Sequence, residues 1–182
     1  YYKEVIRSSA LSKEMRDFRL KQFKNFIRKY ELNNKKIIEI GCGYGEYLSI
    51  ISRLGAKCYG LENSEQAIGY CRKNKLDVCG GFIKNSKIKI GGSPFDAFFM
   101  FNFLEHLPNP NSLLKGIANN LTNGAVGIIE VPNFDMILKK KLFSEFTIDH
   151  LSYFTKDTLE SALKINGFEI LDCKPIWHDY SL

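Results

Sequence analysis

Hydrophobic and polar residues along the chain follow two periodicities, which predict strands and helices. Short runs that are mostly apolar are typical of strands buried in a sheet. Segments in which apolar residues recur three or four positions apart are typical of amphipathic helices. The predicted strands span residues 36–40, 57–61, 77–79, 94–102, 125–131 and 168–177. The predicted helices span residues 11–30, 46–54, 64–74, 111–121, part of 134–146, and 156–165.

Several predicted helices are bounded by residues that commonly begin or end a helix. Asn63 and Thr155 are predicted N-caps, because their side chains can accept hydrogen bonds from N–H groups of the first turn. Gly55 and the pair Asn166-Gly167 predict helix ends. Because strands alternate with helices, we expect an α/β fold with a parallel sheet in a three-layer arrangement.

The stretch from Ile37 to Tyr47 carries the strongest indication of a binding site. Gly41, Gly43 and Gly45 alternate with other residues between a predicted strand and a predicted helix. Glycine adopts positive φ angles and lets a ligand approach the main chain. The helix start that follows presents unpaired N–H groups and a partial positive charge. We therefore expect a nucleotide-like cofactor at this turn.

Two cofactor classes compete for the glycine turn. A dinucleotide-binding turn requires G-x-G-x-x-G, which would place its third glycine at position 46. The chain has Glu46 there, and a carboxylate would repel a pyrophosphate. A NAD-dependent oxidoreductase is therefore the less favoured alternative. The pattern present is instead Glu39-x-Gly41-x-Gly43-x-Gly45.

This pattern resembles the first motif of class I S-adenosylmethionine-dependent methyltransferases, and the resemblance extends over about residues 35–171. It implies a Rossmann-like fold with a mostly parallel sheet. It also implies S-adenosylmethionine as cofactor and S-adenosylhomocysteine as product. The family sheet ends in a hairpin, of which only residues 168–177 are predicted here, so its last antiparallel strand is expected to be missing.

The resemblance also implies a set of cofactor-binding residues. Glu62, at the end of the second predicted strand, is expected to bind both ribose hydroxyls, and a carboxylate suits this because it can accept two hydrogen bonds from a diol. The residues implied around the first two strands are Glu39, Gly41, Cys42, Gly43, Gly45, Tyr47, Glu62 and Asn63.

A second part of the resemblance lies at residues 95–107, which are similar to the family's fourth strand and the Leu-Glu-His that follows it. Asn102 and Phe103, at the end of this strand, are expected to face the cofactor. Phe82 and Ile83 lie where the family usually holds the adenine ring. Glu105-His106 is either a catalytic pair or a structural anchor of its loop, and the resemblance favours the anchor.

The segment from Phe146 to Thr155 is the predicted acceptor site. It resembles the E-H-L-x-Y-F-[ST] element that follows strand five in many small-molecule and sugar methyltransferases. An unperturbed histidine titrates near pH 6.5, so neutral His150 is expected to act as a general base, while Asp149 orients it or serves as the base itself. The sequence thus indicates methylation of a small molecule, with a hydroxyl of a sugar or sugar-derived metabolite favoured.

Other acceptors remain as alternatives. Sugar C-methyltransferases usually carry a tyrosine and a glutamate where this chain has Thr147 and Asp149, so carbon methylation is less favoured. A quinone or phenol hydroxyl is the main alternative. Enzymes that methylate exocyclic amines of nucleic acids carry an Asn/Asp-Pro-Pro-aromatic motif after strand four, where this chain has residues 102–105, Asn-Phe-Leu-Glu. An RNA methyltransferase is accordingly less favoured.

Composition and charge narrow this picture. The 182 residues, 45% of them hydrophobic, suit one globular domain over residues 1–182, with a helix at residues 11–31 leading into the core. The net charge of +6 comes from lysines spread along the chain, which is more typical of a solvated surface than of a nucleic-acid site. No apolar run approaches the roughly 20 residues of a membrane span, so no membrane partner is expected. The oligomeric state is left open.

Five cysteines are present, an odd number without a CxxC pair. This pattern argues against a disulfide framework and against a zinc site, so no metal ligand is predicted. It suits a reducing compartment, and a cytoplasmic location is expected.

Overall fold

The computed structural model describes residues 12–182, so residue 11, where the first predicted helix begins, lies outside the described part. The chain divides into two compact units built from interleaved segments. Within the described residues, unit 1 comprises 12–82, 90–99 and 120–127, and unit 2 comprises 83–89, 100–119 and 128–182. Each unit contains part of the predicted functional residues. A single domain over residues 1–182 stays a prediction.

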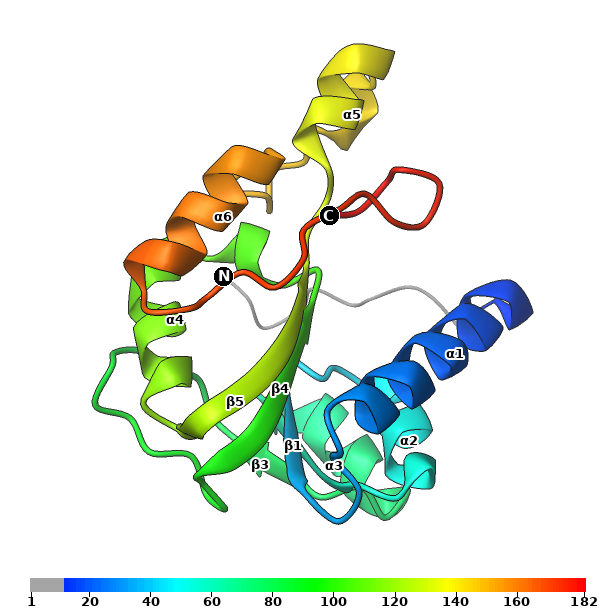
Figure 1. Ribbon diagram of the computed structural model, residues 1–182, viewed down its shortest axis with the longest axis vertical. Coiled ribbons are helices and arrows are strands. Elements are labelled where there is room, and N and C mark those ends of the chain that lie inside the picture. The colour runs from blue at the N-terminus through cyan, green and yellow to red at the C-terminus, as the bar shows by residue number, and fades with distance from the viewer. Residues whose placement is uncertain (1–11) are drawn as a thin grey trace. The chain divides into compact units, whose positions relative to one another are not determined.

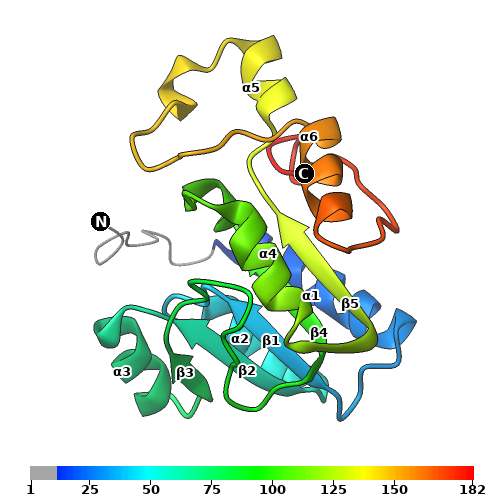
Figure 2. The same ribbon diagram turned by 90° about the vertical axis from the view of Figure 1, so that its left-hand side faces the viewer.

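Among residues 12–182, five strands form one sheet in the order β3-β2-β1-β4-β5. They are β1 (Lys36–Ile40), β2 (Lys57–Glu62), β3 (Val78–Gly80), β4 (Phe95–Phe101) and β5 (Leu121–Glu130). β1 pairs in parallel with β2, and β2 pairs in parallel with β3; these three strands lie next to one another in Figure 2. The prediction of an α/β fold with a mostly parallel sheet is confirmed.

The described part of unit 1 contains the helices α1 (Lys13–Lys29), α2 (Glu46–Ile51) and α3 (Glu65–Lys73). The helices α1 and α2 lie side by side (Figure 1). Phe23 of α1 stacks on Phe99 of β4, with ring centroids 5.2 Å apart, and meets the edge of the Tyr47 ring. The guanidinium of the buried Arg19 lies 4.9 Å from the Tyr47 ring centroid. Aromatic packing thus fixes α1 and α2 on the sheet.

The predicted helix ends in unit 1 are mostly correct. A 3₁₀ turn, η2 (Ser52–Leu54), extends α2 as far as Gly55, whose φ of 88° ends the helix. The N-cap of α3 is Ser64 and not Asn63 as predicted, because the Ser64 side chain accepts a hydrogen bond of 3.3 Å from the N–H of Ala67. The main-chain N–H of Asn63 instead bonds the neighbouring Glu62 side chain.

Unit 2 contains α4 (Pro110–Ala118), α5 (Phe134–Lys140) and α6 (Lys156–Ile165), with the 3₁₀ turns η3 (Leu104–His106) and η4 (Phe143–Glu145). The helices α4 and α6 lie side by side in Figure 1 and are joined by a 2.7 Å hydrogen bond from Asn166 to Asn111. The sequence placed α4 too late, because Pro110 is tolerated in the first helical turn and Asn109 caps it.

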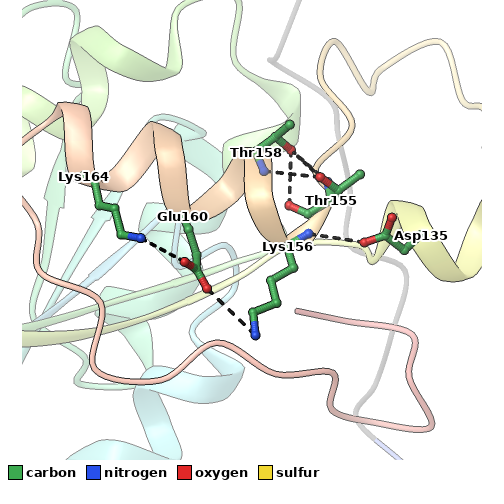
Figure 3. A network of polar contacts seen from close by, with 6 residues as sticks. All are labelled: Asp135, Thr155, Lys156, Thr158, Glu160 and Lys164. Carbon is green, nitrogen blue, oxygen red and sulfur yellow. Dashed lines mark hydrogen bonds and ion pairs between the residues drawn. The ribbon is translucent and has the colours of Figure 1, made fainter.

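The start of α6 is confirmed at the predicted cap. Thr155 and Thr158 form a reciprocal capping box, and the N–H of Lys156 donates to the Asp135 carboxylate of α5 (Figure 3). Glu160 lies between Lys156 and Lys164 on the same helix face, at 4.0 and 3.0 Å. These contacts tie α6 to α5 within unit 2.

The predicted sixth strand, residues 168–177, is wrong. The segment forms no strand, and Pro175 removes one main-chain donor that a ladder would need. The chain turns back through Trp177, His178 and Asp179, which all have positive φ. Its last residue, Leu182, then exchanges two main-chain hydrogen bonds with Val131, of 2.9 and 3.2 Å. Near the C-terminus the antiparallel pairs are isolated bridges, of Ser181 with Pro132 and with Ile176.

Candidate functional site

The glycine turn after β1 has the predicted backbone. Gly41, Gly43 and Gly45 adopt φ angles of 69°, 53° and 77°, which only glycine adopts without strain. A Cβ atom added to Gly45 would lie 2.5 Å from Leu76 Cδ1, whereas one added to Gly43 would meet nothing within 4 Å. Gly45 is therefore favoured by its positive φ and by the close packing of Leu76, and Gly43 leaves open space beside the main chain.

Glu62 connects the end of β2 to this turn. Its Oε2 accepts a 2.8 Å hydrogen bond from the N–H of Gly43, and its Oε1 accepts bonds of 2.7 and 2.9 Å from the N–H groups of Asn63 and Ser64. A carboxylate offers about four lone-pair positions. Three are occupied, so one position on Oε2 remains for a further donor. The geometry thus suits one added hydroxyl more readily than two.

Glu39 is buried, with 1% of its surface exposed, and lies two residues before Gly41. Its negative charge contributes to raised thiol pKa values nearby. Burial, followed by the charge of Glu39, raises the pKa of Cys58 to about 12. The pKa of Cys42 is also raised, first by its contact with Cys71 and then by burial and Glu39. The Glu39 carboxylate therefore lies in a part of unit 1 with a low dielectric constant, where its charge raises the pKa values of nearby thiols.

Two of the predicted cofactor residues point their side chains into the core. Cys42 packs with Leu48 and Cys71, among other buried residues. Tyr47 is 7% exposed and lies beneath α1. Cys42 can therefore reach a ligand only through its main chain, and the Tyr47 ring is primarily a packing group. The signal that sequence reasoning missed is the apolar spacing of α2, which turns Tyr47 toward α1.

Three other predicted cofactor residues lie in unit 2. Asn102 follows β4 with a φ of 46°, and its main-chain N–H donates a 2.8 Å hydrogen bond to the main-chain oxygen of Glu130. Phe103 begins η3 and is partly exposed. Ile83 is buried, and a Cβ on Gly116 of α4 would lie 2.2 Å from it, so its side chain packs on α4. Phe82, in unit 1, is partly exposed.

The predicted acceptor pair, Asp149 and His150, is arranged differently from the prediction. Asp149 lies beside His106: its main-chain oxygen is 3.0 Å and its Oδ2 3.5 Å from His106 Nδ1. A hydrogen bond from Thr147 is the main cause that lowers the pKa of Asp149, so this carboxylate is ionised near neutral pH. Asp149 is thus placed to hold His106 rather than His150.

His150 lies against two other rings. Its ring centroid is 4.8 Å from that of His106 and 5.9 Å from that of Tyr153. Its Nδ1 atom is buried and has no hydrogen-bond partner among residues 12–182. Burial, followed by the charge of His106, lowers the pKa of His150, although Asp149 and Glu145 raise it in part. The imidazole is therefore neutral at pH 7.

Glu105, His106 and His150 each place one possible ligand atom within 4.8 Å of the others. This grouping alone does not define a metal site, because carboxylate and imidazole groups also gather in hydrogen-bonded clusters. Nδ1 of His106 is already directed at a main-chain oxygen. From the sequence, Glu105 and His106 are expected to be either a catalytic pair or an anchor of their loop. Their proximity to His150 could not be predicted, because it depends on the path of the chain between η3 and residue 150.

A sheet of this strand order, with a glycine turn after β1 and an acidic residue at the end of β2, has the fold of class I S-adenosylmethionine-dependent methyltransferases. Residues 11–172 match the family model described as a methyltransferase domain, and the chain belongs to this family. The resemblance in the sequence is thereby confirmed.

Solved structures of similar fold include the plantazolicin methyltransferase BpumL in complex with S-adenosylhomocysteine. It matches with a TM-score of 0.68 and 22% identity, covering 85% of this chain and 65% of that chain. A SAM-dependent methyltransferase from Archaeoglobus fulgidus matches with a TM-score of 0.60 and 24% identity, covering 82% and 69%.

Curated relatives are similar over shorter stretches. The ubiquinone biosynthesis O-methyltransferase of Glaesserella parasuis serovar 5 is 30% identical over 112 residues, which cover 56% of this chain and 47% of the relative. The C-methyltransferase NovU of Streptomyces niveus is 21% identical over 139 residues, which cover 75% and 33%. The chain thus spans half or less of the length of these two relatives. In the described part of the chain, every helix is too short or too polar to cross a bilayer.

Proposed function

We propose that this protein transfers a methyl group from S-adenosylmethionine to a hydroxyl group of a small molecule. The main support for S-adenosylmethionine as the methyl donor is the glycine turn, in which the N–H of Gly43 bonds Glu62 and open space lies beside Gly43. Membership of the methyltransferase-domain family supports the same donor. The residues of unit 1 are the proposed donor site, and the loop around His150 in unit 2 is the proposed acceptor site.

The residues present fit the methyl donor. The remaining lone pair on Oε2 of Glu62 would accept a hydrogen bond from a ribose hydroxyl, and the main chain at Gly43 leaves room for the ligand. For Asn102 and Phe103, which belong to unit 2, a role in donor binding stays a prediction from the sequence. When bound, S-adenosylmethionine would supply a methyl group on a positively charged sulfur. As the acceptor oxygen bonds the methyl carbon, the carbon–sulfur bond would break and S-adenosylhomocysteine would be the leaving group.

His150 is the proposed base for the acceptor. A hydroxyl oxygen that gains a methyl group must lose its proton, and a neutral imidazole can take it. His150 meets this requirement because its lowered pKa keeps it neutral at pH 7 and no other group holds its Nδ1 atom among the described residues. The products are then a methyl ether, S-adenosylhomocysteine and a protonated His150. Asp149 supports the base indirectly, through His106.

We favour a sugar or sugar-derived hydroxyl as acceptor, because the segment from Phe146 to Thr155 resembles the element of small-molecule and sugar methyltransferases. A phenol or quinol hydroxyl is the second candidate. The rings of Phe134, Phe146 and Tyr153 lie 5.1–5.9 Å from one another next to His150, and such a cluster suits an aromatic acceptor. Several relatives are named ubiquinone biosynthesis O-methyltransferases, which supports the same candidate.

A methyl-transfer assay with radiolabelled S-adenosylmethionine tests this proposal. The acceptor panel would contain nucleotide-linked sugars, free sugars, catechols and quinols, with a tRNA pool as the nucleic-acid comparison. We expect label in a sugar or, as the second candidate, in a phenol, and little in RNA. Methyl transfer to RNA alone, or to no acceptor although S-adenosylmethionine binds, would overturn the assignment of a small-molecule hydroxyl as the acceptor.

A further inference from the structure

The η3 turn holds the loop that carries the proposed base. The main-chain oxygen of Glu105 accepts two hydrogen bonds, of 2.9 Å from the N–H of Leu151 and 3.0 Å from the N–H of Ser152. These two donors directly follow His150. The loop is therefore fixed on its C-terminal side by the main chain of η3, independently of any side chain.

His106 holds the same loop on the other side of His150. Its Nδ1 atom lies 3.0 Å from the main-chain oxygen of Asp149. A carbonyl oxygen can only accept, so the proton of this hydrogen bond must be on Nδ1 of His106. In a neutral His106 the other nitrogen, Nε2, is then unprotonated, and it lies 3.8 Å from Glu105 Oε1. The tautomer of His106 is thus set by the residue that precedes the proposed base.

The rings of His106 and His150 also touch. Their centroids are 4.8 Å apart and their planes are inclined by 70°. The charged groups that face His150 are His106 from η3, Asp149 from its own loop and Glu145 from η4. Glu105, Asp149 and His150 lie next to His106. His106 therefore bounds one side of the space in which the His150 ring can turn.

We propose that His106 is a positioning residue for His150: its Nδ1–H holds the Asp149 carbonyl and its ring fixes the orientation of the His150 ring. This role rests on the proposed function, in which His150 takes the acceptor proton. His106 acts through His150 and does not itself contact the acceptor. A base that is misplaced by about 1 Å can lose on the order of 100-fold in rate, so the effect is measurable.

Three variants of His106 separate positioning from bulk packing. In His106→Asn the side-chain amide can place an N–H near the position of Nδ1, whereas in His106→Gln the amide reaches the position of Nε2 instead. His106→Leu removes both donors. We expect kcat to fall on the order of 10- to 100-fold in the Gln and Leu variants and only a few-fold in the Asn variant. KM for S-adenosylmethionine should be unchanged in all three. His178→Asn, at an exposed histidine of the same unit, is the matched control.

An NMR titration of the imidazole signals gives a readout that needs no acceptor. The chain has three histidines, so each signal can be assigned from one variant. In the wild type, His150 should titrate below its ordinary pKa of 6.5. All three variants lose the His106 charge, so the pKa of His150 should rise somewhat in each. In His106→Gln and His106→Leu the released loop also exposes His150, so its pKa should lie nearer to 6.5 than in His106→Asn.

The two readouts keep the proposals distinguishable. If no acceptor is methylated by the wild type, the proposed function fails, while the titration still measures whether His106 holds His150. If His150 titrates at the same pH in His106→Leu as in His106→Asn, which both lack the His106 charge, His106 is not a positioning residue, even where methyl transfer is established. Equal kcat values for the Asn and Gln variants would also overturn the role of Nδ1. Activity that depends on an added divalent metal and is lost in all three variants would replace positioning by metal binding.

Discussion

The main-chain N–H of Gly43 donates a 2.8 Å hydrogen bond to Oε2 of Glu62. This bond joins the turn after β1 to the end of β2, two segments that the parallel pairing of β1 and β2 brings to the same edge of the sheet. Glu62 is held by two more N–H groups at the start of α3. Its carboxylate is therefore positioned before any ligand arrives, which lowers the cost of ordering it on binding.

Replacing Glu62 by glutamine should weaken donor binding. The amide group of Glu62→Gln has an NH₂ where a carboxylate oxygen now accepts N–H bonds, so at least one acceptor is lost. A hydrogen bond to a charged group contributes about 1.5–3 kcal/mol, so the dissociation constant for S-adenosylmethionine should rise about 10- to 100-fold in calorimetry. Glu65→Gln, at an exposed residue in the first turn of α3, is the control. Equal affinities of the two variants would contradict the role of Glu62.

Gly45→Ala should mainly lower stability, whereas Gly43→Ala should mainly weaken binding of the methyl donor. Gly45→Ala places a Cβ 2.5 Å from Leu76 at a φ of 77°, so strain and overpacking together should cost about 2–5 kcal/mol in urea denaturation. Gly43→Ala should cost only about 1–2 kcal/mol from its positive φ, because its Cβ meets no protein atom within 4 Å. That Cβ fills the open space of the proposed donor site, so Gly43→Ala should weaken binding of S-adenosylmethionine more than it lowers stability. A Gly43→Ala protein with unchanged donor affinity would place the ligand elsewhere.

The pH dependence of turnover should reflect His150. A base is inactive when protonated, so kcat/KM falls as the pH falls through the pKa of His150. Because burial and then the charge of His106 lower this pKa, the midpoint of the acid limb should lie below 6.5. His150→Gln should lower kcat by about 10²- to 10⁴-fold and remove this limb. An acid limb that persists unchanged in His150→Gln would show that another group takes the proton.

Tyr180 should stabilise unit 2 through a single hydrogen bond. Its hydroxyl donates to the Glu145 carboxylate of η4, and burial together with this contact raises the pKa of Tyr180 to about 12. Tyr180→Phe should lower the free energy of unfolding by about 1 kcal/mol, since the partly exposed bond is weakened by solvent. Tyr70→Phe, at an exposed tyrosine of unit 1, should change it little. The tyrosine absorbance change on raising the pH should show Tyr180 ionising late in the wild type.

The sequence predicted elements best where one local cause decides them. β1 and α6 have the predicted bounds, because a short run that is mostly apolar and a threonine cap can be recognised without the fold. The Asn63 cap was wrong because Glu62 accepts the Asn63 N–H, and the next residue, Ser64, caps the helix instead. Residues 168–177 looked like a strand, yet a strand also requires a partner with free main-chain groups, and sequence periodicity does not supply that information.

The sequence predicted the glycine turn and Glu62 well, but it did not predict the contact between Asp149 and His106. The positive φ angles of the glycine turn follow from glycine itself, and the position of Glu62 follows from the parallel pairing of the first two strands. The pairing of Asp149 with His106 does not follow from the sequence, because 43 positions separate the two residues. Residues 148–149 form a turn closed by a hydrogen bond from the N–H of His150 to the Thr147 oxygen, and the turn brings Asp149 next to His106.

Isothermal titration calorimetry of the wild-type protein with S-adenosylmethionine and, separately, with NAD tests the central claim most directly. The glycine turn with Glu46 after Gly45, and with Glu62 bonded to Gly43, predicts binding of S-adenosylmethionine and S-adenosylhomocysteine and no heat of binding with NAD. Binding of NAD without binding of S-adenosylmethionine would contradict the account.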